Sequence, residues 1–296
     1  MKANDERRVA ATVLKTPTLF RETVSVLAQS RTAVAGALII LVFALCAIAA
    51  PLLAPHDPVA QAIPERHQPP FSSGHLLGTD ELGRDLPSRI IYGARISMII
   101  GLVSVGISLS LGLLIGTLSG YYGGWFDRIV MRLIDIMLAF PYILLTIVIV
   151  AILGSSLVNA MVAIGISQVP VYARVVRASV LAEKENDYVM AERSLGTRDL
   201  GLMAGTILPN CLAPIFVQAT LGIGDAILSS AALSFLGLGA KPPTPEWGLM
   251  IASAKEFVTS SWWIVTFPGI AILLTVLGFN LLSDSLRDAL DPRLRD

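Results

Sequence analysis

Long stretches without charge constrain the fold of this chain more than any other feature. Five runs contain no Asp, Glu, Lys or Arg: residues 32–56, 96–126, 136–173, 200–224 and 257–283. A helix needs about 20 apolar residues to cross the roughly 30 Å hydrocarbon core of a bilayer. Charged residues make up 15% of the chain, whereas soluble domains carry about 25%. The sequence therefore predicts an all-α membrane protein.

The run 136–173 is too long for one span, and the tripeptide "GSS" at 154–156 predicts a tight turn that divides it. This division gives six transmembrane helices. We expect them near residues 33–54, 96–118, 131–153, 157–177, 211–235 and 264–284.

The orientation follows from Lys and Arg, which are enriched in cytoplasmic loops. With the N-terminus inside, cytoplasmic segments hold 16 of these residues and external segments hold 6. Both termini are thus predicted to be cytoplasmic. The expected organisation is a cytoplasmic N-terminal segment (1–31), a first span (32–54), an extracytoplasmic loop (55–95), a five-helix core (96–286) with a cytoplasmic loop at 178–208, and a cytoplasmic tail (287–296).

Several function classes lack their sequence signatures. A formal net charge of zero argues against a nucleic-acid partner, and no Lys follows a Gly, so there is no P-loop for ATP. His56, His67 and His75 have spacings that match no common metal site, and we interpret them as solvated loop residues. Cys46 and Cys211 lie in apolar runs and resemble small packed side chains. We expect no catalytic group, metal or cofactor site in this chain.

Polar residues within the fifth expected helix indicate a functional face. Gln218, Gly222, Asp225 and Ser229 are spaced so that they share one helical face. An Asp at the centre of a span costs roughly 2.5–3.5 kcal/mol on insertion scales, so Asp225 is expected to face water or a partner. One interpretation is the wall of an aqueous pathway in which Asp225 meets a substrate amine, with Gln168 on the fourth helix as a weaker member. The other is a polar interface between helices.

Three glycines in the second expected helix predict close helix packing. Gly112, Gly116 and Gly120 recur every four residues. Stacked G-x-x-x-G patterns let two helix backbones approach each other closely.

The charged segment between the fourth and fifth helices is predicted to be helical. The stretch "SVLAEKENDYVMAERSL" has helix-forming composition, and Gly196 is suited to end that helix. Thr197 is then expected to cap a short second helix with Asp199 in its first turn. Pro209 is expected to open the next span, because a proline at the first helical position loses no hydrogen bond.

The motif "DYVMAERSLG" followed by "LPN" resembles the cytoplasmic loop of ABC-importer permeases, with Ala191, Gly196 and Pro209-Asn210 at the matching positions. The resemblance implies a coupling helix over residues 183–202 that docks in a cleft of an ATPase subunit. Glu192 stands where the family prefers a small residue, and Gly205-Thr206 where Arg-His is frequent. The residues that the resemblance assigns to ATPase coupling are Asp187, Tyr188, Ala191, Glu192, Arg193, Gly196, Thr197, Pro209 and Asn210.

Further motifs are similar to the dipeptide/oligopeptide/nickel subgroup of these permeases. They include "HLLGTDELGRDLPSRIIYGARIS" at 75–97 and "GFNLLSDSLRDALDPRLR" at 278–295, and "PNCLAPIFVQATLG" most resembles the C-type subunit of dipeptide permeases. The resemblance implies a type I importer fold in the bacterial inner membrane and import of dipeptides or oligopeptides. The implied partners are a second permease, two ATPase subunits that bind ATP and Mg, and an extracytoplasmic binding protein. Nickel or glutathione-like solutes, and an ion-coupled secondary transporter, stay open as alternatives.

Overall fold

The architecture is helical throughout the part of the chain that can be described. A computed structural model describes residues 26–72 and 74–290, so most of the expected N-terminal segment 1–31 and of the tail 287–296 lies outside the described residues. Within the described ranges there is no strand, and the only pairings of extended backbone are two isolated bridges. The prediction of an all-α protein is confirmed.

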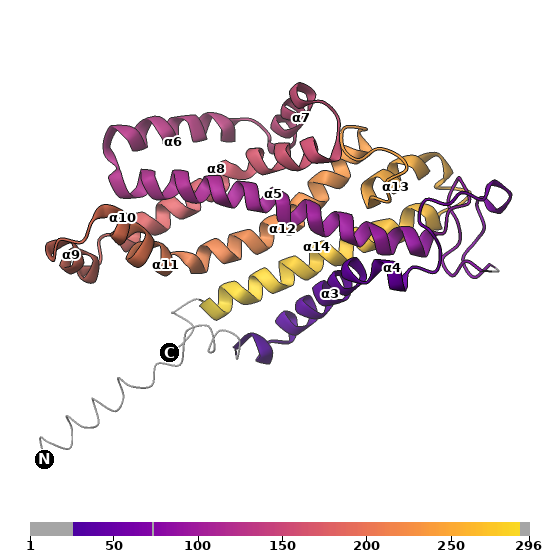
Figure 1. Ribbon diagram of the computed structural model, residues 1–296, viewed down its shortest axis with the longest axis horizontal. Coiled ribbons are helices and arrows are strands. Elements are labelled where there is room, and N and C mark those ends of the chain that lie inside the picture. The colour runs from indigo at the N-terminus through magenta and orange to yellow at the C-terminus, as the bar shows by residue number, and fades with distance from the viewer. Residues whose placement is uncertain (1–25, 73, 291–296) are drawn as a thin grey trace, which may run out of the picture.

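Within residues 26–72 and 74–290, five helices are long and apolar enough to cross a membrane. They are α3 (Arg31–Ile48), α5 (Leu86–Tyr122), α8 (Leu157–Glu183), α12 (Leu212–Phe235) and α14 (Trp263–Leu290). They run along the long axis of the molecule (Figure 1). The shorter elements are α4 (Ala50–Leu53), the 3-10 turn η1 (Ile63–Glu65), α6 (Gly124–Ala139), α7 (Tyr142–Leu153), α9 (Asp187–Ser194), α10 (Asp199–Gly201), the π-helical turn η2 (Leu202–Ile207), α11 (Leu208–Asn210), α13 (Trp247–Ala254) and the 3-10 turn η3 (Lys255–Phe257).

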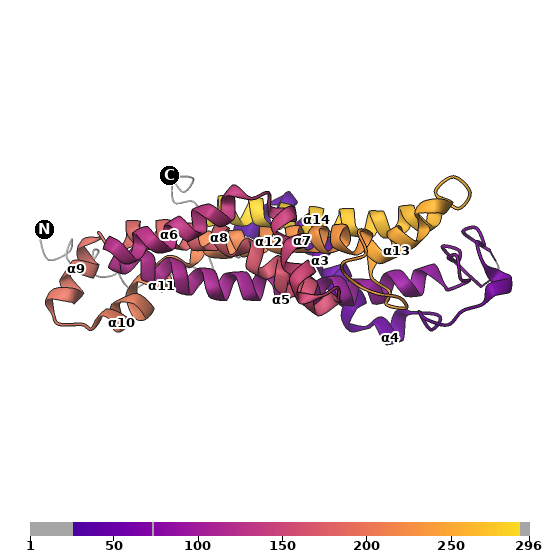
Figure 2. The same cartoon turned by 90° about the horizontal axis from the view of Figure 1, so that it is seen from above.

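The two ends of the molecule carry different structures. Helices α9 and α10 project at one end, and the loop between α4 and α5 lies at the opposite end in both views (Figure 2). Helix α12 begins near the α9–α10 end and runs toward the middle of the bundle. In the chain, α9 and α10 are followed by η2 and α11, which lead into the start of α12.

The expected single helix over 131–153 is wrong. The chain forms α6 and α7 there, and the two helices are bent by 97° with respect to each other. The break falls at Phe140 and Pro141, where Phe140 has extended backbone. A proline removes a helical hydrogen bond and disfavours helical geometry in the residue before it. The sixth span exists only if this bent pair is counted as one.

Helix α5 begins at Leu86, ten residues before the expected second helix, so its first turns fall within the stretch 55–95 that was predicted to be a loop. The Asp85 carboxylate accepts a hydrogen bond of 3.0 Å from a first-turn backbone N–H, which caps the helix. Arg89 then lies inside the helix, 2% exposed, with its guanidinium 3.4 Å from the Asp80 carboxylate. The Asp80 carboxylate and the Pro58 carbonyl oxygen, which accepts from Arg89 Nη1 at 2.9 Å, offset part of the cost of burying this charge inside the helix.

The glycines of α5 lie where α5 meets α8, the most extensive helix contact in the fold. A Cβ atom on Gly116 would lie 2.6 Å from the carbonyl oxygen of Ala173, and one on Gly120 would lie 3.0 Å from the side chain of Val180. A Cβ atom on Gly112 would have as little space, because it would meet the preceding turn of α8. The neighbour of this glycine face is therefore a helix of the same chain, and a methyl group there would force the helices apart.

Candidate functional site

A cavity of about 400 Å³ opens where α8 and α12 face the bend between α6 and α7. A volume in this range suits a small ligand. Four of the five residues expected to line a pathway meet here, namely Gln168, Gln218, Asp225 and Ser229. The complete lining is Met137, Leu138, Phe140, Tyr142, Ile143, Leu145, Ser167, Gln168, Val171, Tyr172, Gln218, Asp225, Leu228, Ser229 and Ala232.

Gly222, the fifth expected residue, lies behind the cavity wall instead of lining it. A Cβ atom on Gly222 would clash with the hydroxyl group of Tyr172. That hydroxyl donates a hydrogen bond of 3.3 Å to the backbone carbonyl of Gln218. Gly222 therefore leaves the space in which the Tyr172 ring reaches across from α8 to α12.

The polar groups of the cavity wall are only partly satisfied by the protein. The Tyr142 hydroxyl donates to Ser229 Oγ at 3.0 Å, and Gln168 Nε2 donates to the Tyr142 hydroxyl at 3.4 Å. Gln168 Oε1 and Ser167 Oγ are buried without a hydrogen-bond partner among the described residues. Unpaired buried polar atoms are costly, so this wall is suited to a polar ligand or to water.

Asp225 carries the charge of this cavity. Its side chain is exposed, and among the described residues no cation forms an ion pair with it. Apolar side chains make up most of the surrounding wall. An unpaired carboxylate in such a setting attracts a cation or a hydrogen-bond donor.

At the other end of α12, the charged segment folds into two short helices joined at Gly196. Gly196 has φ +85°, and the turn is closed by hydrogen bonds from Gly196 N to Arg193 O at 3.0 Å and from Thr197 N to Glu192 O at 3.2 Å. These two bonds are the pattern of a Schellman C-cap, in which glycine supplies the left-handed residue. The expected cap of the second helix by Thr197 is wrong, because the N-cap of α10 is Arg198 and no side chain caps it.

Side-chain contacts fix this pair of helices to the bundle. Thr206 donates to the Glu192 carboxylate at 2.6 Å, which links the two positions where the sequence departs from the family pattern. Tyr121 at the end of α5 donates to Asp199 at 2.6 Å, and Arg193 lies over the Tyr121 ring at 5.5 Å. The segment is thus held to α5 and to η2.

Four further residues proposed for coupling belong to the same segment or to the helix that follows it. Asn210 donates to the Tyr188 hydroxyl at 3.2 Å, and Pro209 lies in the first turn of α11, directly before α12. Asp187 begins α9.

The tip of the segment is apolar and uncovered. Leu195 is 86% exposed and Leu200 is 74% exposed, on either side of Gly196. Ala191 is exposed as well. Exposed large apolar side chains clustered at a helical tip are typical of a surface that another protein covers.

Sequence reasoning missed an ion pair beside this segment. Arg177 on α8 binds Asp127 on α6 through two bonds of 2.6 Å, and Ser119 donates to the same carboxylate at 2.7 Å. A paired Arg–carboxylate bridge of this geometry is strong and specific. The only sign of this ion pair in the sequence was that Asp127 and Arg177 lie just outside uncharged runs. Because the two residues are far apart in the chain, no spacing rule pairs them.

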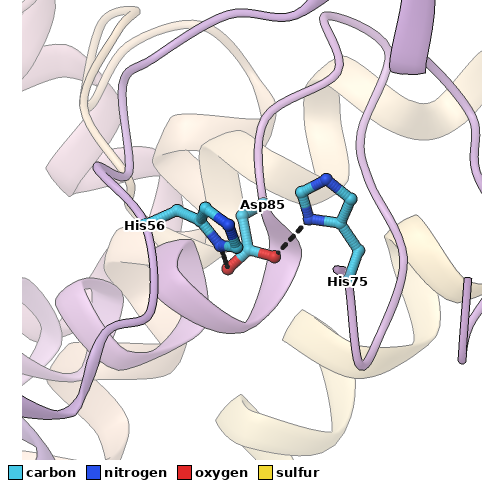
Figure 3. Close-up of side chains that lie close together, drawn as sticks. All are labelled: His56, His75 and Asp85. Carbon is cyan, nitrogen blue, oxygen red and sulfur yellow. Dashed lines mark hydrogen bonds and ion pairs between the residues drawn. The ribbon is translucent and has the colours of Figure 1, made fainter. Parts of the chain in front are cut away.

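The interpretation of the loop histidines as solvated is wrong for His75, whose residue is 8% exposed. His75 and His56 lie against Asp85, with His75 Nδ1 at 2.7 Å and His56 Nδ1 at 3.5 Å from its two oxygens (Figure 3). His67 lies apart, where its Nδ1 is 3.1 Å from Ser261 Oγ.

The helical spans, the largely apolar cavity around Asp225 and the exposed helical tip agree with the fold of a type I ABC importer permease. The fold is similar to a solved structure of the MetNI methionine ABC transporter in an inward-facing conformation, with a TM-score of 0.55, 19% sequence identity, and coverage of 68% of this chain and 96% of that one. Residues 112–296 match the family described as binding-protein-dependent transport system inner membrane component. Residues 18–70 match the N-terminal TM domain of oligopeptide transport permease C. The chain belongs to this family of inner-membrane transport permeases.

Bacterial relatives match nearly the whole chain. The di/tripeptide transport system permease protein DppC of Pseudomonas aeruginosa is 50% identical over 274 residues, which is 91% of this chain and 90% of the relative. The dipeptide transport system permease protein DppC of Escherichia coli K12 is 51% identical over 272 residues, covering 90% and 91%. The chain is therefore a multi-pass protein of the inner membrane, and membership of this family implies ATPase and binding-protein partners in general.

Proposed function

We propose that this chain is a permease subunit of an ATP-driven importer of dipeptides and oligopeptides, and that it forms one half of the translocation path. The observation that carries the proposal is the identity of about one half, over nine tenths of both chains, with permeases named for dipeptide transport. These relatives favour a peptide over nickel or a glutathione-like solute, and they give no support to an ion-coupled transporter. Two further partners fit the proposal, a second permease and an extracytoplasmic binding protein.

The cavity supports recognition of a peptide backbone. Asp225 is an unpaired carboxylate that suits the ammonium group of a peptide N-terminus. Gln168 Oε1 and Ser167 Oγ are buried in this wall without a hydrogen-bond partner among the described residues, and a small rotation of either side chain would let it accept from an amide N–H group. The rest of the wall is apolar and would accept peptide side chains of different kinds. This chain would therefore recognise the polar backbone of the peptide and would select little among its side chains.

Coupling to ATP would pass through residues 183–202. We place this segment and both chain termini on the cytoplasmic side, following the distribution of Lys and Arg. Two separate ATPase subunits would bind ATP and Mg, draw together, and move the Leu195 tip with them. Because the segment leads through Pro209 directly into α12, its displacement would tilt the helix that carries Asp225. Energy would enter as differential binding of ATP to the two conformations.

Uptake into proteoliposomes tests this function. Vesicles would contain the chain with its partner permease and ATPase subunits, and would receive the binding protein loaded with a labelled dipeptide. We expect uptake to require ATP at the ATPase face and to stop with vanadate. A protonophore should leave uptake within about twofold of the untreated rate, whereas an ion-coupled transporter would lose its driving force.

Vanadate-insensitive uptake that a protonophore abolishes would contradict the proposed function. The control is a binding protein of a different importer, loaded with its own labelled ligand. We expect no uptake of that label. If the purified binding protein carries nickel chelates and no peptide, as judged by mass spectrometry, the substrate assignment is wrong while the importer class stands.

A further inference from the structure

Three side chains that are separated in sequence converge at the end of the molecule opposite α9. His56 follows α4, His75 lies in the loop, and Asp85 is the N-cap of α5. The carboxylate lies between the two imidazole rings, with one oxygen directed at each (Figure 3). One potential ligand atom from each residue lies within 4.8 Å of the others.

This set of atoms is suited to a transition-metal ion. Two imidazole nitrogens and one carboxylate oxygen form a ligand set that Zn²⁺ binds, with metal–ligand distances of about 2.0–2.2 Å. Ligand atoms of a tetrahedral site then lie about 3.3 Å apart. His56 Nδ1 lies 3.5 Å from Asp85 Oδ2 and His75 Nδ1 lies 2.7 Å from Asp85 Oδ1, so each imidazole faces a different oxygen of the carboxylate. Side-chain shifts on the order of half an ångström to one ångström would bring both nitrogens and the carboxylate around one ion.

The residues around the three candidate ligands hold them as in known metal centres. A metal-bound histidine almost always donates its other ring N–H to a carboxylate or carbonyl. The Nε2 atom of His75 lies 3.3 Å from Glu65 Oε2, while its Nδ1 atom faces Asp85. Asp85 is fixed in turn, because its Oδ2 atom accepts from Ser88 N at 3.0 Å and from Ser88 Oγ at 2.6 Å.

Burial favours binding and still leaves a route of entry. The side chains of His75 and Asp85 are 9% and 1% exposed, so an ion between them would be shielded from water. The His56 side chain is 44% exposed. An ion could therefore reach the site past His56, and a water molecule could complete the fourth position.

We propose that His56, His75 and Asp85 bind one divalent transition-metal ion of the Zn²⁺ type, with Glu65 as the residue that orients His75. The ion would fasten the loop between α4 and α5 to the N-terminus of α5. No feature of the proposed transport function requires this site, so its test is independent of that function.

A proton is the competing occupant of the same cluster. Burial of the His75 ring disfavours its charged form, but the hydrogen bonds and charges of Asp85 and Glu65 outweigh burial and raise the pKa of His75. A protonated His75 would hold the two carboxylates without any metal. The experiment therefore has to separate metal binding from this ion-free arrangement.

The test is titration of the assembled transporter with Zn²⁺ alone by calorimetry, in nanodiscs and after treatment with a chelator. We expect the wild-type complex to bind one equivalent more than complexes carrying His56→Ala or His75→Ala. His67→Ala is the matched control, because His67 lies in the same loop but contacts Ser261 instead, and it should bind as wild type does. Glu65→Gln should weaken the site by about 10–100-fold.

Cobalt provides the second readout. Co²⁺ added to the metal-free complex should give the intense visible absorption of a four-coordinate site, and His56→Ala should abolish it. His56 is half exposed, so His56→Ala is expected to keep the wild-type thermal midpoint in metal-free buffer. If His75→Ala fails to fold, His56→Ala alone decides between metal binding and the ion-free cluster. Equal Zn²⁺ stoichiometry and equal Co²⁺ spectra in wild type and His56→Ala would overturn the proposal in favour of the protonated cluster.

Discussion

Gly196→Val is expected to reduce ATP-driven uptake at least tenfold while the protein still inserts and assembles. Gly196 has φ +85°, and no atom lies within 4 Å of the place that an added Cβ would take, so the substitution meets no steric obstacle beyond its own backbone. A residue with a side chain costs roughly 1–2 kcal/mol in this left-handed conformation. The chain would relieve that cost by opening the turn between α9 and α10. The exposed Leu195 tip would then be misdirected with respect to its ATPase partner.

The matched control is Gly205→Val. Gly205 lies in the neighbouring π-helical turn, also has no atom within 4 Å of an added Cβ, and does not have a positive φ. It should keep uptake within about twofold of wild type. Gly196→Asn should recover much of the activity, because Asn tolerates the left-handed conformation. Equal loss in Gly196→Val and Gly205→Val, or full uptake in Gly196→Val, would contradict a role for the Gly196 turn.

Asp225→Asn is expected to lower peptide uptake by about 10–100-fold. A hydrogen bond to a charged group is worth about 1.5–3 kcal/mol, and each 1.4 kcal/mol corresponds to a factor of about ten. The amide is nearly the same size as the carboxylate, so the cavity keeps its shape and only the charge is removed. Uptake and peptide-stimulated ATPase activity would be measured at one concentration of loaded binding protein.

Asp284→Asn provides the control for a lost negative charge. Asp284 is an exposed acid on α14 that does not line the cavity, and its loss should leave both rates unchanged. Basal ATPase activity without binding protein should be the same in all three complexes. Wild-type uptake and stimulation in Asp225→Asn would show that Asp225 serves a helix interface and not the pathway.

The spans were predictable because hydropathy is a local property. The start of α8 followed from "GSS" at 154–156, since Gly154 ends α7 and the Ser156 side chain caps α8. Pro141 also indicated a bend in the chain. That signal was missed because Pro141 lies within a long uncharged run, which favoured a single helix. The early start of α5 was not visible, because it depends on Asp80, a partner in the preceding loop that makes a buried Arg89 tolerable.

The candidate site was predictable on α12 and, at Gln168, on α8, but the contacts between the helices were not. The helical period of α12 placed Gln218, Asp225 and Ser229 on one face. It gave no sign that Tyr142 and Tyr172 complete the wall, because both come from other helices and have apolar neighbours in sequence. For the same reason the burial of His75 was missed, since it follows from the fold of the whole loop.

The central claim is that the Leu195 tip faces the ATPase in the cytoplasm, and labelling of a single cysteine tests it most directly. Leu195 and Phe71 lie at opposite ends of the molecule and are 86% and 83% exposed. Each would be changed to cysteine in a protein whose Cys46 and Cys211 have been replaced by serine. A membrane-impermeant maleimide should label Leu195→Cys only in inside-out vesicles, and bound ATPase subunits should reduce that labelling. It should label Phe71→Cys only in right-side-out vesicles. Labelling of Leu195→Cys from the external face would contradict the account.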